Sequence, residues 1–124
     1  IDVFGRAYNP IEKKEESLKD YAFQIVVENC SVDGYFSEKI IDCFATGTVP
    51  IYWGCKNIGD YFDVNGIIIF NNLSELSNII EYLNFFGWDK KFRYIMNNFQ
   101  LFKDYEITED WMWINILEKM WKEK

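Results

Sequence analysis

The sequence predicts an α/β domain in which helices cover both faces of a parallel β-sheet. Short β-rich runs alternate along the chain with stretches of helical periodicity. The run FQIVV at residues 23–27 is rich in β-branched residues, as are the buried strands of parallel sheets. The segments between the runs have lengths typical of α/β units. Together these observations favour a three-layer architecture.

The first part of the chain contributes two of these strands. Residues 1–4 (IDVF) are predicted to form a short strand, and Arg6 follows it. The polar stretch at residues 11–21 has too few apolar positions for a buried face, so we expect a surface helix or turn there. The strand at residues 23–27 comes next. A polar cluster directly follows that strand: Glu28, Asn29, Cys30 and Ser31.

A helix is predicted after this cluster because its start and stop signals agree. Ser37 is expected to be the N-cap, and Glu38 lies in the first turn, where the helix dipole favours an acidic side chain. Gly47 provides the C-terminal stop. Apolar residues recur between these signals at helical spacing: Ile40, Ile41, Phe44 and Ala45.

Two more strands and a helix are predicted in the second half. The strands lie at residues 49–53 (VPIYW) and 66–70 (GIIIF), and Pro50 restricts the first of them to starting there. Either Asn72 or Ser74 then caps a helix. The apolar stripe of that helix is expected to comprise Leu76, Ile79, Ile80, Leu83 and Phe86.

The chain closes with two predicted helical segments. One spans residues 89–102, and the other runs from an N-cap at Thr108 to about residue 121. No internal repeat and no linker rich in Pro, Gly or Ser interrupts the chain. We therefore expect one domain over residues 1–124, with residues 89–122 packing on it or towards a domain outside this chain.

The composition excludes several classes of function. The chain has 124 residues, with 13 Lys+Arg against 20 Asp+Glu and a net charge of −7, which disfavours nucleic acid as a partner. It contains no His, which excludes histidine-based catalytic triads, imidazole zinc ligands and histidine pH switches. A general base would have to be a carboxylate, Lys, Tyr or Cys. No apolar run approaches the ~20 residues of a membrane span, and no signal-peptide pattern opens the chain.

Cysteine spacing and aromatic content suggest the setting of the domain. Cys30, Cys43 and Cys55 fit neither a CxxC metal site nor a disulfide framework, so we expect reduced thiols in a reducing compartment, the cytoplasm. The 11 Phe, 8 Tyr and 5 Trp exceed the needs of a small core, so some rings are expected to face a ligand or another domain. Because position 1 is Ile, we expect a piece of a longer protein.

Polar residues follow each of the first three predicted strands. Arg6 comes after the first strand, Glu28 and Asn29 after the second, and residues 54–57 after the third. Ligands of parallel α/β sheets bind beyond the carboxyl ends of the strands. We therefore expect a binding site at this edge of the sheet.

The loop at residues 33–39 (DGYFSEK) indicates which ligand this edge could bind. A helix N-terminus favours an anion, commonly a phosphate, and Lys39 in the first turn adds a positive charge. Arg6 could reach the same crevice with a guanidinium suited to phosphate oxygens. Tyr35 supplies a ring for stacking, and Glu38 can accept hydrogen bonds from sugar hydroxyls. The sequence thus predicts a nucleotide-sugar site.

Ordinary structural explanations stay open at this point. Ser37 and Glu38 form a good helix start in any protein, and Lys39 would then be a solvated surface charge. Glu28 could be an exposed carboxylate at the sheet edge. The stretch GTVPIYWG at residues 47–54 could be a helix stop, a strand and a turn, although its glycines would also let the backbone approach a ligand closely.

Residues 28–54 (ENCSVDGYFSEKIIDCFATGTVPIYWG) resemble the signature of glycosyltransferase family 10, the α-1,3/4-fucosyltransferases. That signature runs approximately as Glu-Asn-Ser, a short spacer, Tyr-x-Thr-Glu-Lys, a helix, and Gly-x-x-Pro-x-x-x-Gly. The opening IDVFGR is similar to the family's Val-Asp-Val-Phe-Gly-Arg, and GIIIFNNLSEL at residues 66–76 resembles its later strand and helix. The resemblance covers roughly residues 1–103.

The resemblance implies a fold and a reaction. The fold is GT-B, in which two Rossmann-like domains face each other, and this chain would be the C-terminal, donor-binding half. The reaction is an inverting transfer of fucose from GDP-fucose to a hydroxyl of a glycan acceptor. The carboxylate that acts as general base would belong to the N-terminal domain, so this chain is expected to be inactive alone. No bound metal and no other cofactor is expected.

The resemblance also implies roles for individual residues. Arg6 and Lys39 would hold the diphosphate and, with Glu38, stabilise the transition state and leaving group. Glu38 would contact hydroxyls of ribose or fucose. The other implied donor-binding residues are Asn29 and Tyr35 around the nucleotide, Glu28 supporting the loop or the reacting sugar, and Ser37 at the helix start. This sequence departs from the signature at Cys30, which replaces Ser and removes a hydroxyl, and at Ser37, which replaces Thr.

Two alternatives to this function remain. The domain could use another nucleotide sugar on the same scaffold. It could also be a noncatalytic interaction module that binds a partner through its last helix, where apolar residues form a stripe: Trp111, Ile114, Leu117 and Trp121. For the full-length protein, a membrane-peripheral location is a further expectation.

Overall fold

The computed structural model describes residues 21–112. The predicted strand at residues 1–4, Arg6 and most of the polar stretch at residues 11–21 lie outside the described residues. The stripe of the last helix lies outside them from residue 113 onward.

The described part of the chain contains a parallel sheet whose strands lie in the order β1-β2-β3. The strands are β1 (Phe23–Val27), β2 (Val49–Trp53) and β3 (Ile68–Ile69). Phe23 pairs with Val49 and Ile51 pairs with Ile68, so the strands run in register across the sheet. The predicted bounds of β1 and β2 are confirmed.

The third strand is shorter than the predicted residues 66–70. Val64–Gly66 forms a 3-10 turn, because the Asp63 side chain accepts a hydrogen bond from the backbone N–H of Asn65 at 2.9 Å and caps it. The turn therefore takes Gly66 out of the predicted strand. Beyond β3, the N–H of Phe70 still donates to the carbonyl of Tyr52 at 3.0 Å.

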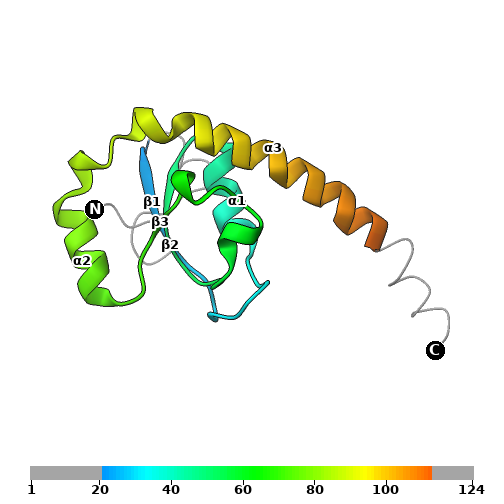
Figure 1. Cartoon of the computed structure of the whole chain (residues 1–124), viewed down its shortest axis with the longest axis horizontal. Coiled ribbons are helices and arrows are strands. Elements are labelled where there is room, and N and C mark those ends of the chain that lie inside the picture. Colours follow the sequence, from blue (N-terminus) through cyan, green and yellow to red (C-terminus); the bar gives the residue numbers. More distant parts are fainter. Residues whose placement is uncertain (1–20, 113–124) are drawn as a thin grey trace, which may run out of the picture.

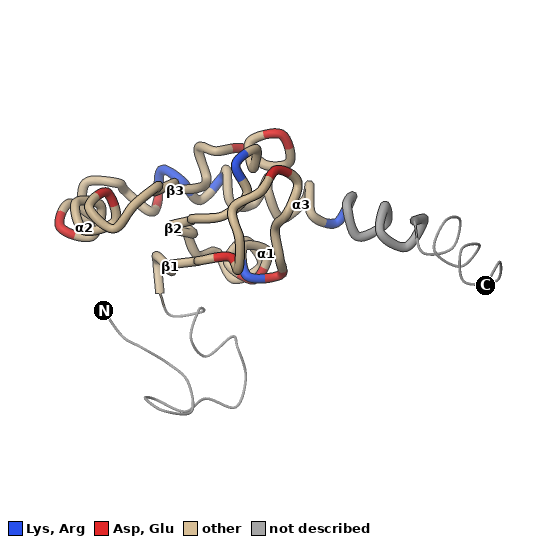
Figure 2. Tube along the Cα trace, turned by 90° about the horizontal axis from the view of Figure 1, so that it is seen from below, with Lys and Arg blue, Asp and Glu red and all other residues tan. Residues whose placement is uncertain are grey.

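Helices lie on both sides of this sheet. In Figures 1 and 2, α1 (Glu38–Ala45) and α2 (Leu73–Glu81) flank the strands on opposite sides. The helix α3 (Trp88–Met112) crosses the end of the sheet where the strands begin and continues past it (Figure 1). The predicted α/β fold with a three-layer arrangement is confirmed. Loops, rather than α3, lie at the edge of the sheet where the strands end.

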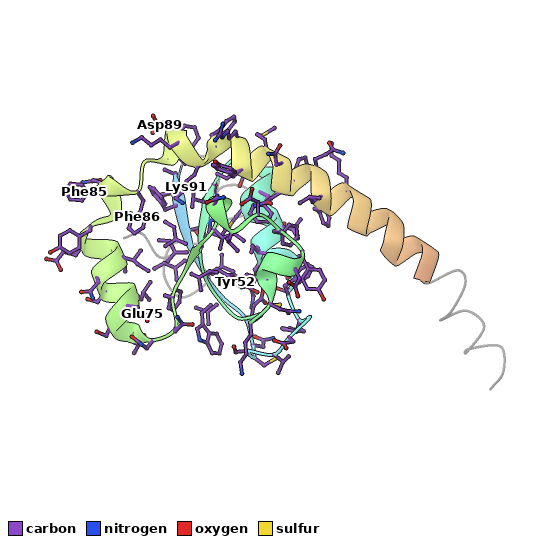
Figure 3. All side chains as sticks on the ribbon, in the orientation of Figure 1. Tyr52, Glu75, Phe85, Phe86, Asp89 and Lys91 are labelled. Carbon is purple, nitrogen blue, oxygen red and sulfur yellow. The ribbon has the colours of Figure 1, made fainter. Side chains whose placement is uncertain are left out.

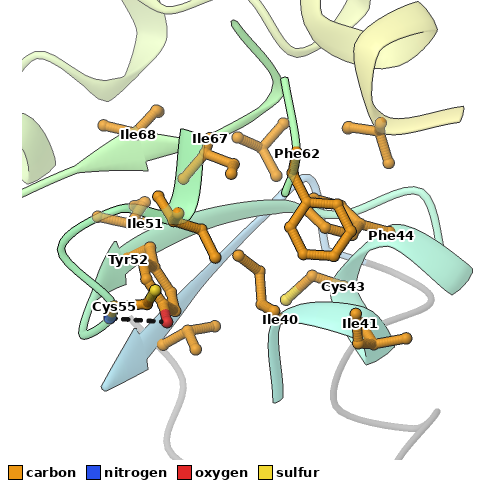
Figure 4. Packing of buried hydrophobic residues seen from close by; sticks show 14 of the residues in the cluster. Ile40, Ile41, Cys43, Phe44, Ile51, Tyr52, Cys55, Phe62, Ile67 and Ile68 are labelled. Atoms are coloured by element: carbon orange, nitrogen blue, oxygen red, sulfur yellow. Dashed lines mark hydrogen bonds between the residues drawn. The ribbon is translucent and has the colours of Figure 1, made fainter. Parts of the chain in front are cut away.

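The main core lies between α1 and the sheet (Figure 4). From α1, Ile40 and Phe44 are almost fully buried and meet Ile51 and Phe62. The rings of Phe44 and Phe62 lie 5.1 Å apart, a favourable aromatic distance. Ala45, which was expected on the apolar stripe, is exposed. This core fixes the position of α1 and therefore of its N-terminus.

The second predicted helix is shorter than its sequence stripe suggested. Asn72 is its N-cap, because its Oδ1 accepts from the N–H of Glu75 at 2.8 Å. The helix ends at Glu81, so the expected stripe residues Leu83 and Phe86 lie beyond it. A 3-10 turn (Leu83–Phe85) follows, and Gly87 adopts a φ of 63° before α3 begins.

The helix α3 runs without a break through Thr108, so the prediction of a new helix capped there is wrong. No Gly or Pro occurs between residues 88 and 112, and the backbone hydrogen bonds therefore continue. The first half of α3 is anchored by Trp88, whose Nε1 donates to the carbonyl of Gly47 at 2.7 Å, and by fully buried Ile95. None of the helices within residues 21–112 is long and apolar enough to cross a membrane.

All three cysteines are free thiols within the described residues, as predicted. Cys30 is exposed, whereas Cys43 and Cys55 are buried. Burial, with a smaller contribution from Asp42, raises the pKa of the Cys43 thiol from 9.0 to about 12. A buried, protonated thiol is a poor nucleophile.

We therefore expect one fast-reacting thiol in the folded chain. Ellman's reagent should label Cys30 quickly at neutral pH and label all three thiols only after denaturation. The variant Cys30→Ser should lose the fast phase. A second fast thiol in the native chain would contradict the buried positions.

The raised pKa of Cys43 also predicts that the free energy of unfolding falls as the pH rises above 9.0, because the Cys43 thiol ionises there only in the unfolded chain.

Candidate functional site

The carboxyl ends of β1 and β2 bring together several of the predicted site residues. Glu28 follows β1 directly, and the loop of residues 29–36 leads from it to Ser37 at the start of α1. The strand β2 ends beside this loop at Trp53. Acidic and basic positions adjoin one another along α1 (Figure 2), and Tyr52 lies at this end of the sheet (Figure 3).

Glu28 is buried and faces the start of α1. Only 3% of its surface is exposed, so it is no solvated carboxylate at the sheet edge. Its Oε1 accepts from the N–H of Ser37 at 3.0 Å and from the hydroxyl of Tyr52 at 3.3 Å. Its Oε2 accepts from the hydroxyl of Ser37 at 2.7 Å. Through these hydrogen bonds, Glu28 connects the end of β1 to Tyr52 of β2 and to the N-terminus of α1.

Ser37 is confirmed as the N-cap of α1. Its Oγ accepts from the N–H of Lys39 at 3.3 Å while its own hydroxyl donates to Glu28. The positive end of the α1 dipole thus already has an internal carboxylate beside it. These contacts fix the end of the loop at Ser37. That Ser37 contacts a donor directly stays a prediction.

Tyr52 completes this buried network. Its hydroxyl oxygen accepts from the N–H of Cys55 at 3.1 Å and donates to Glu28. Burial above all raises the pKa of the Tyr52 phenol far above its ordinary range, and the neighbouring carboxylate of Glu28 adds to the shift. The phenol therefore stays protonated and keeps its donor.

Gly54 fits against this network because it has no side chain. A Cβ at this position would overlap the Cγ of Glu28 and lie 2.8 Å from the hydroxyl oxygen of Tyr52. The N–H of Glu28 also donates to the carbonyl of Trp53, at 3.0 Å. The second glycine of the stretch GTVPIYWG is thus required by close packing of the two loops.

Lys39 lies where a phosphate could reach it. The side chain is half-buried, and its Nζ donates to the carbonyl of Val27 at 3.2 Å, at the end of β1. An ammonium group carries three donors, so this hydrogen bond leaves capacity for an anion. The contact also holds the positive charge at the carboxyl edge, which a fully solvated lysine would not do.

The remaining predicted residues lie on the exposed side of the same edge. Asn29, Tyr35 and Glu38 are exposed, and the loop that carries the first two joins β1 to α1. Cys30 is exposed as well. Arg6 lies outside the described residues, so its position next to Lys39 stays a prediction. Within residues 21–112, no group of three or more Cys, Asp or Glu side chains could hold a metal ion.

Three residues join the loops of this edge through hydrogen bonds that no sequence pattern predicted, although Ser31 and Asn57 were expected among the polar residues there. Ser31 donates from its hydroxyl to the carbonyl of Gly54 at 2.7 Å. Asn57 accepts at Oδ1 from the N–H of Gly34 at 2.7 Å. Tyr52 is the third. Each bond joins segments that lie 23 or 24 residues apart, so no local pattern signals it.

Comparison with known proteins gives a consistent result. Residues 1–122 match the family profile described as glycosyltransferase family 10 (fucosyltransferase), C-terminal part. The alpha-(1,3)-fucosyltransferase FucT of Helicobacter pylori is 32% identical over 78 residues, which are 63% of this chain and 16% of the relative. Alpha-(1,3)-fucosyltransferase B of Drosophila melanogaster is 32% identical over 91 residues, 73% of this chain and 20% of the relative.

Solved structures agree with these relatives. Crystal structures of an alpha1,3-fucosyltransferase with GDP-fucose and with GDP each align with a TM-score of 0.59 and 31% identity. Each alignment covers 76% of this chain and 28% of the solved chain. The present chain therefore spans less than a third of the proteins that it resembles.

Proposed function

Because this chain belongs to glycosyltransferase family 10, the fucosyltransferases, we propose that it binds GDP-fucose at the carboxyl ends of β1 and β2. The observation that carries the proposal is the placement of Lys39. Its ammonium is held against the end of β1, beside the loop of residues 29–36. The GDP-fucose and GDP complexes among the similar structures support the choice of ligand.

The proposed roles follow the chemistry of the residues. Lys39 and Arg6 bind the diphosphate, Asn29 and Tyr35 surround the nucleotide, and Glu38 accepts hydrogen bonds from hydroxyls of ribose or fucose. Glu28 and Ser37 support these groups by holding the start of α1, where Lys39 lies.

The proposed reaction is an inverting transfer. The acceptor hydroxyl attacks the anomeric carbon of fucose, the bond to the β-phosphate breaks, and GDP leaves with the electron pair. Positive charges from Lys39 and Arg6 stabilise the negative charge that develops on the leaving diphosphate, without a metal ion. The proton of the hydroxyl goes to a carboxylate of another domain, so this chain alone is inactive in the proposal. The acceptor glycan, that other domain and a reducing, cytoplasmic setting are parts of the same proposal.

Replacing Lys39 by alanine should weaken GDP binding by about 1–3 kcal/mol, which is roughly 5- to 150-fold in Kd, because a charge-assisted phosphate contact is lost. Isothermal titration calorimetry of the chain with GDP measures this. Lys90→Ala is the matched control, because Lys90 is an exposed lysine in the first turn of α3, at the opposite end of the sheet. Thermal unfolding of both variants checks that the loss of the bond to Val27 has not unfolded the domain.

The proposal fails if the wild-type chain does not bind GDP at about millimolar concentration, or if Lys39→Ala binds as tightly as Lys90→Ala. A competition series with GDP-fucose, GDP-mannose and UDP sugars then identifies the donor. Preference for a UDP sugar would favour a transferase with a different donor on the same scaffold.

A further inference from the structure

The loop that joins β1 to α1 is tied to the connection between β2 and β3. We call residues 29–36 the donor loop, because Asn29 and Tyr35 belong to it. The hydroxyl of Ser31 donates to the carbonyl of Gly54, and the ring of Phe36 lies 5.1 Å from that of Tyr61. Asn57, which lies between Gly54 and Tyr61 in the sequence, contacts the tip of the donor loop at Gly34.

Asn57 is held in one orientation by three partners. Its Oδ1 accepts from the N–H of Gly34 at 2.7 Å and lies 3.1 Å from the sulfur of Cys55. Its Nδ2 donates to Oδ2 of Asp60 at 3.1 Å. Both ends of the amide are therefore engaged, so the side chain is fixed before it meets the donor loop.

The contact at Gly34 controls the backbone directly before Tyr35. Gly34 has a φ of 78°, in the left-handed region that favours glycine. The other contacts of this tip are few, since Val32, Asp33, Gly34 and Tyr35 are all exposed. A loop with so little buried surface gains order chiefly from hydrogen bonds, and ordering it costs about 1–2 kcal/mol per residue.

We propose that Asn57 is a positioning residue for the nucleotide donor, which acts by holding Gly34 and thereby orders Tyr35 before the donor binds. This inference rests on the proposed function. Asn57 does not contact the donor in this proposal. Its effect is to reduce the conformational entropy that the donor loop loses on binding. Asn57 lies outside residues 28–54, the segment that matches the family signature.

The first test compares Asn57→Ala with wild type in the 124-residue chain. Asn57→Ala should weaken GDP binding about tenfold in calorimetry and speed amide hydrogen exchange at Gly34 and Tyr35 by a similar factor, while exchange in β1 and β2 stays unchanged. Asn84→Ala, at an exposed asparagine in the turn Leu83–Phe85, is the matched control and should change neither quantity.

A swapped pair separates positioning from a general loss of structure. Asn57→Asp alone places a second carboxylate within hydrogen-bonding distance of Asp60. Because the two like charges repel each other, the variant should weaken GDP binding at neutral pH as Asn57→Ala does. The double variant Asn57→Asp with Asp60→Asn restores both hydrogen bonds at unchanged net charge, so it should recover wild-type binding and exchange.

The outcomes distinguish this inference from the proposed function. If wild type binds GDP and Asn57→Ala binds equally well, the role of Asn57 is wrong and the proposed function stands. If the double variant does not recover binding, positioning through these two hydrogen bonds is wrong. If wild type does not bind GDP, the proposed function fails, and the role of Asn57 at a donor site fails with it. The exchange rates still measure whether Asn57 orders the loop.

Discussion

Replacing Gly54 by alanine is expected to lower the free energy of unfolding by about 3 kcal/mol and to abolish GDP binding. The new Cβ would overlap the side chain of Glu28 and lie too close to the hydroxyl oxygen of Tyr52. Neither side chain can move away, because both are buried and hydrogen-bonded to each other, and Glu28 is also hydrogen-bonded to Ser37 at the start of α1. The variant therefore breaks the network that holds Ser37 and, through it, the position of Lys39.

Urea unfolding followed by circular dichroism measures the stability of this variant, and calorimetry measures GDP binding. Gly59→Ala is the matched control, since Gly59 is exposed and its Cβ would meet only Val64, at 3.2 Å. We expect a change below about 1 kcal/mol there. Near-wild-type stability and GDP affinity in Gly54→Ala would show that the two loops are not packed as described.

Replacing Asn98 by alanine is expected to cost about 3 kcal/mol of stability. Asn98 is fully buried in α3, and its Oδ1 accepts from the N–H of Asp63 at 2.8 Å while its Nδ2 donates to the carbonyl of the same residue at 3.0 Å. Alanine would leave both backbone groups without these partners and would also remove buried volume. Urea unfolding measures the loss.

The neighbouring Asn97→Ala provides the control for this prediction, because Asn97 lies on the same helix and is exposed. Its stability should change by less than about 0.5 kcal/mol. Both hydrogen bonds of the Asn98 side chain go to Asp63, which is not part of the donor loop. Asn98→Ala should therefore keep its GDP affinity under conditions in which it is folded, in contrast to Gly54→Ala. Equal stability of the two asparagine variants would contradict the described anchoring of α3.

The patterns that predicted the fold lie within short segments of the sequence. They predicted an element correctly where all the signals in its segment agreed. Residues 23–27 and 49–53 form strands with the predicted bounds, and Ser37 caps α1 as expected. The errors came where one local signal was overruled. Asp63 formed a turn that shortened β3, and Thr108 did not start a helix because nothing before it ended one.

The sequence predicted that Glu28, Ser37 and Lys39 would meet at one edge of the sheet, and they do, but it did not predict their contacts. Polar residues that follow successive strands predicted the candidate site at the carboxyl edge, since parallel strands end on the same side of a sheet. Whether Glu28 would face solvent, a ligand or the protein could not be judged from its position alone. The structure turns it inward, where it binds Ser37 and Tyr52.

The sequence by itself determined the class of fold, the family signature and the residues that could meet a nucleotide sugar, because periodicity, caps and motifs depend on neighbours along the chain. The tertiary structure decided which of those residues are buried beneath the candidate site and which are exposed there. Glu28 with Tyr52, and Gly34 with Asn57, are paired across 24 and 23 residues of chain. Such pairs form only when the packed core brings β1, β2 and α1 together, and no local pattern encodes them.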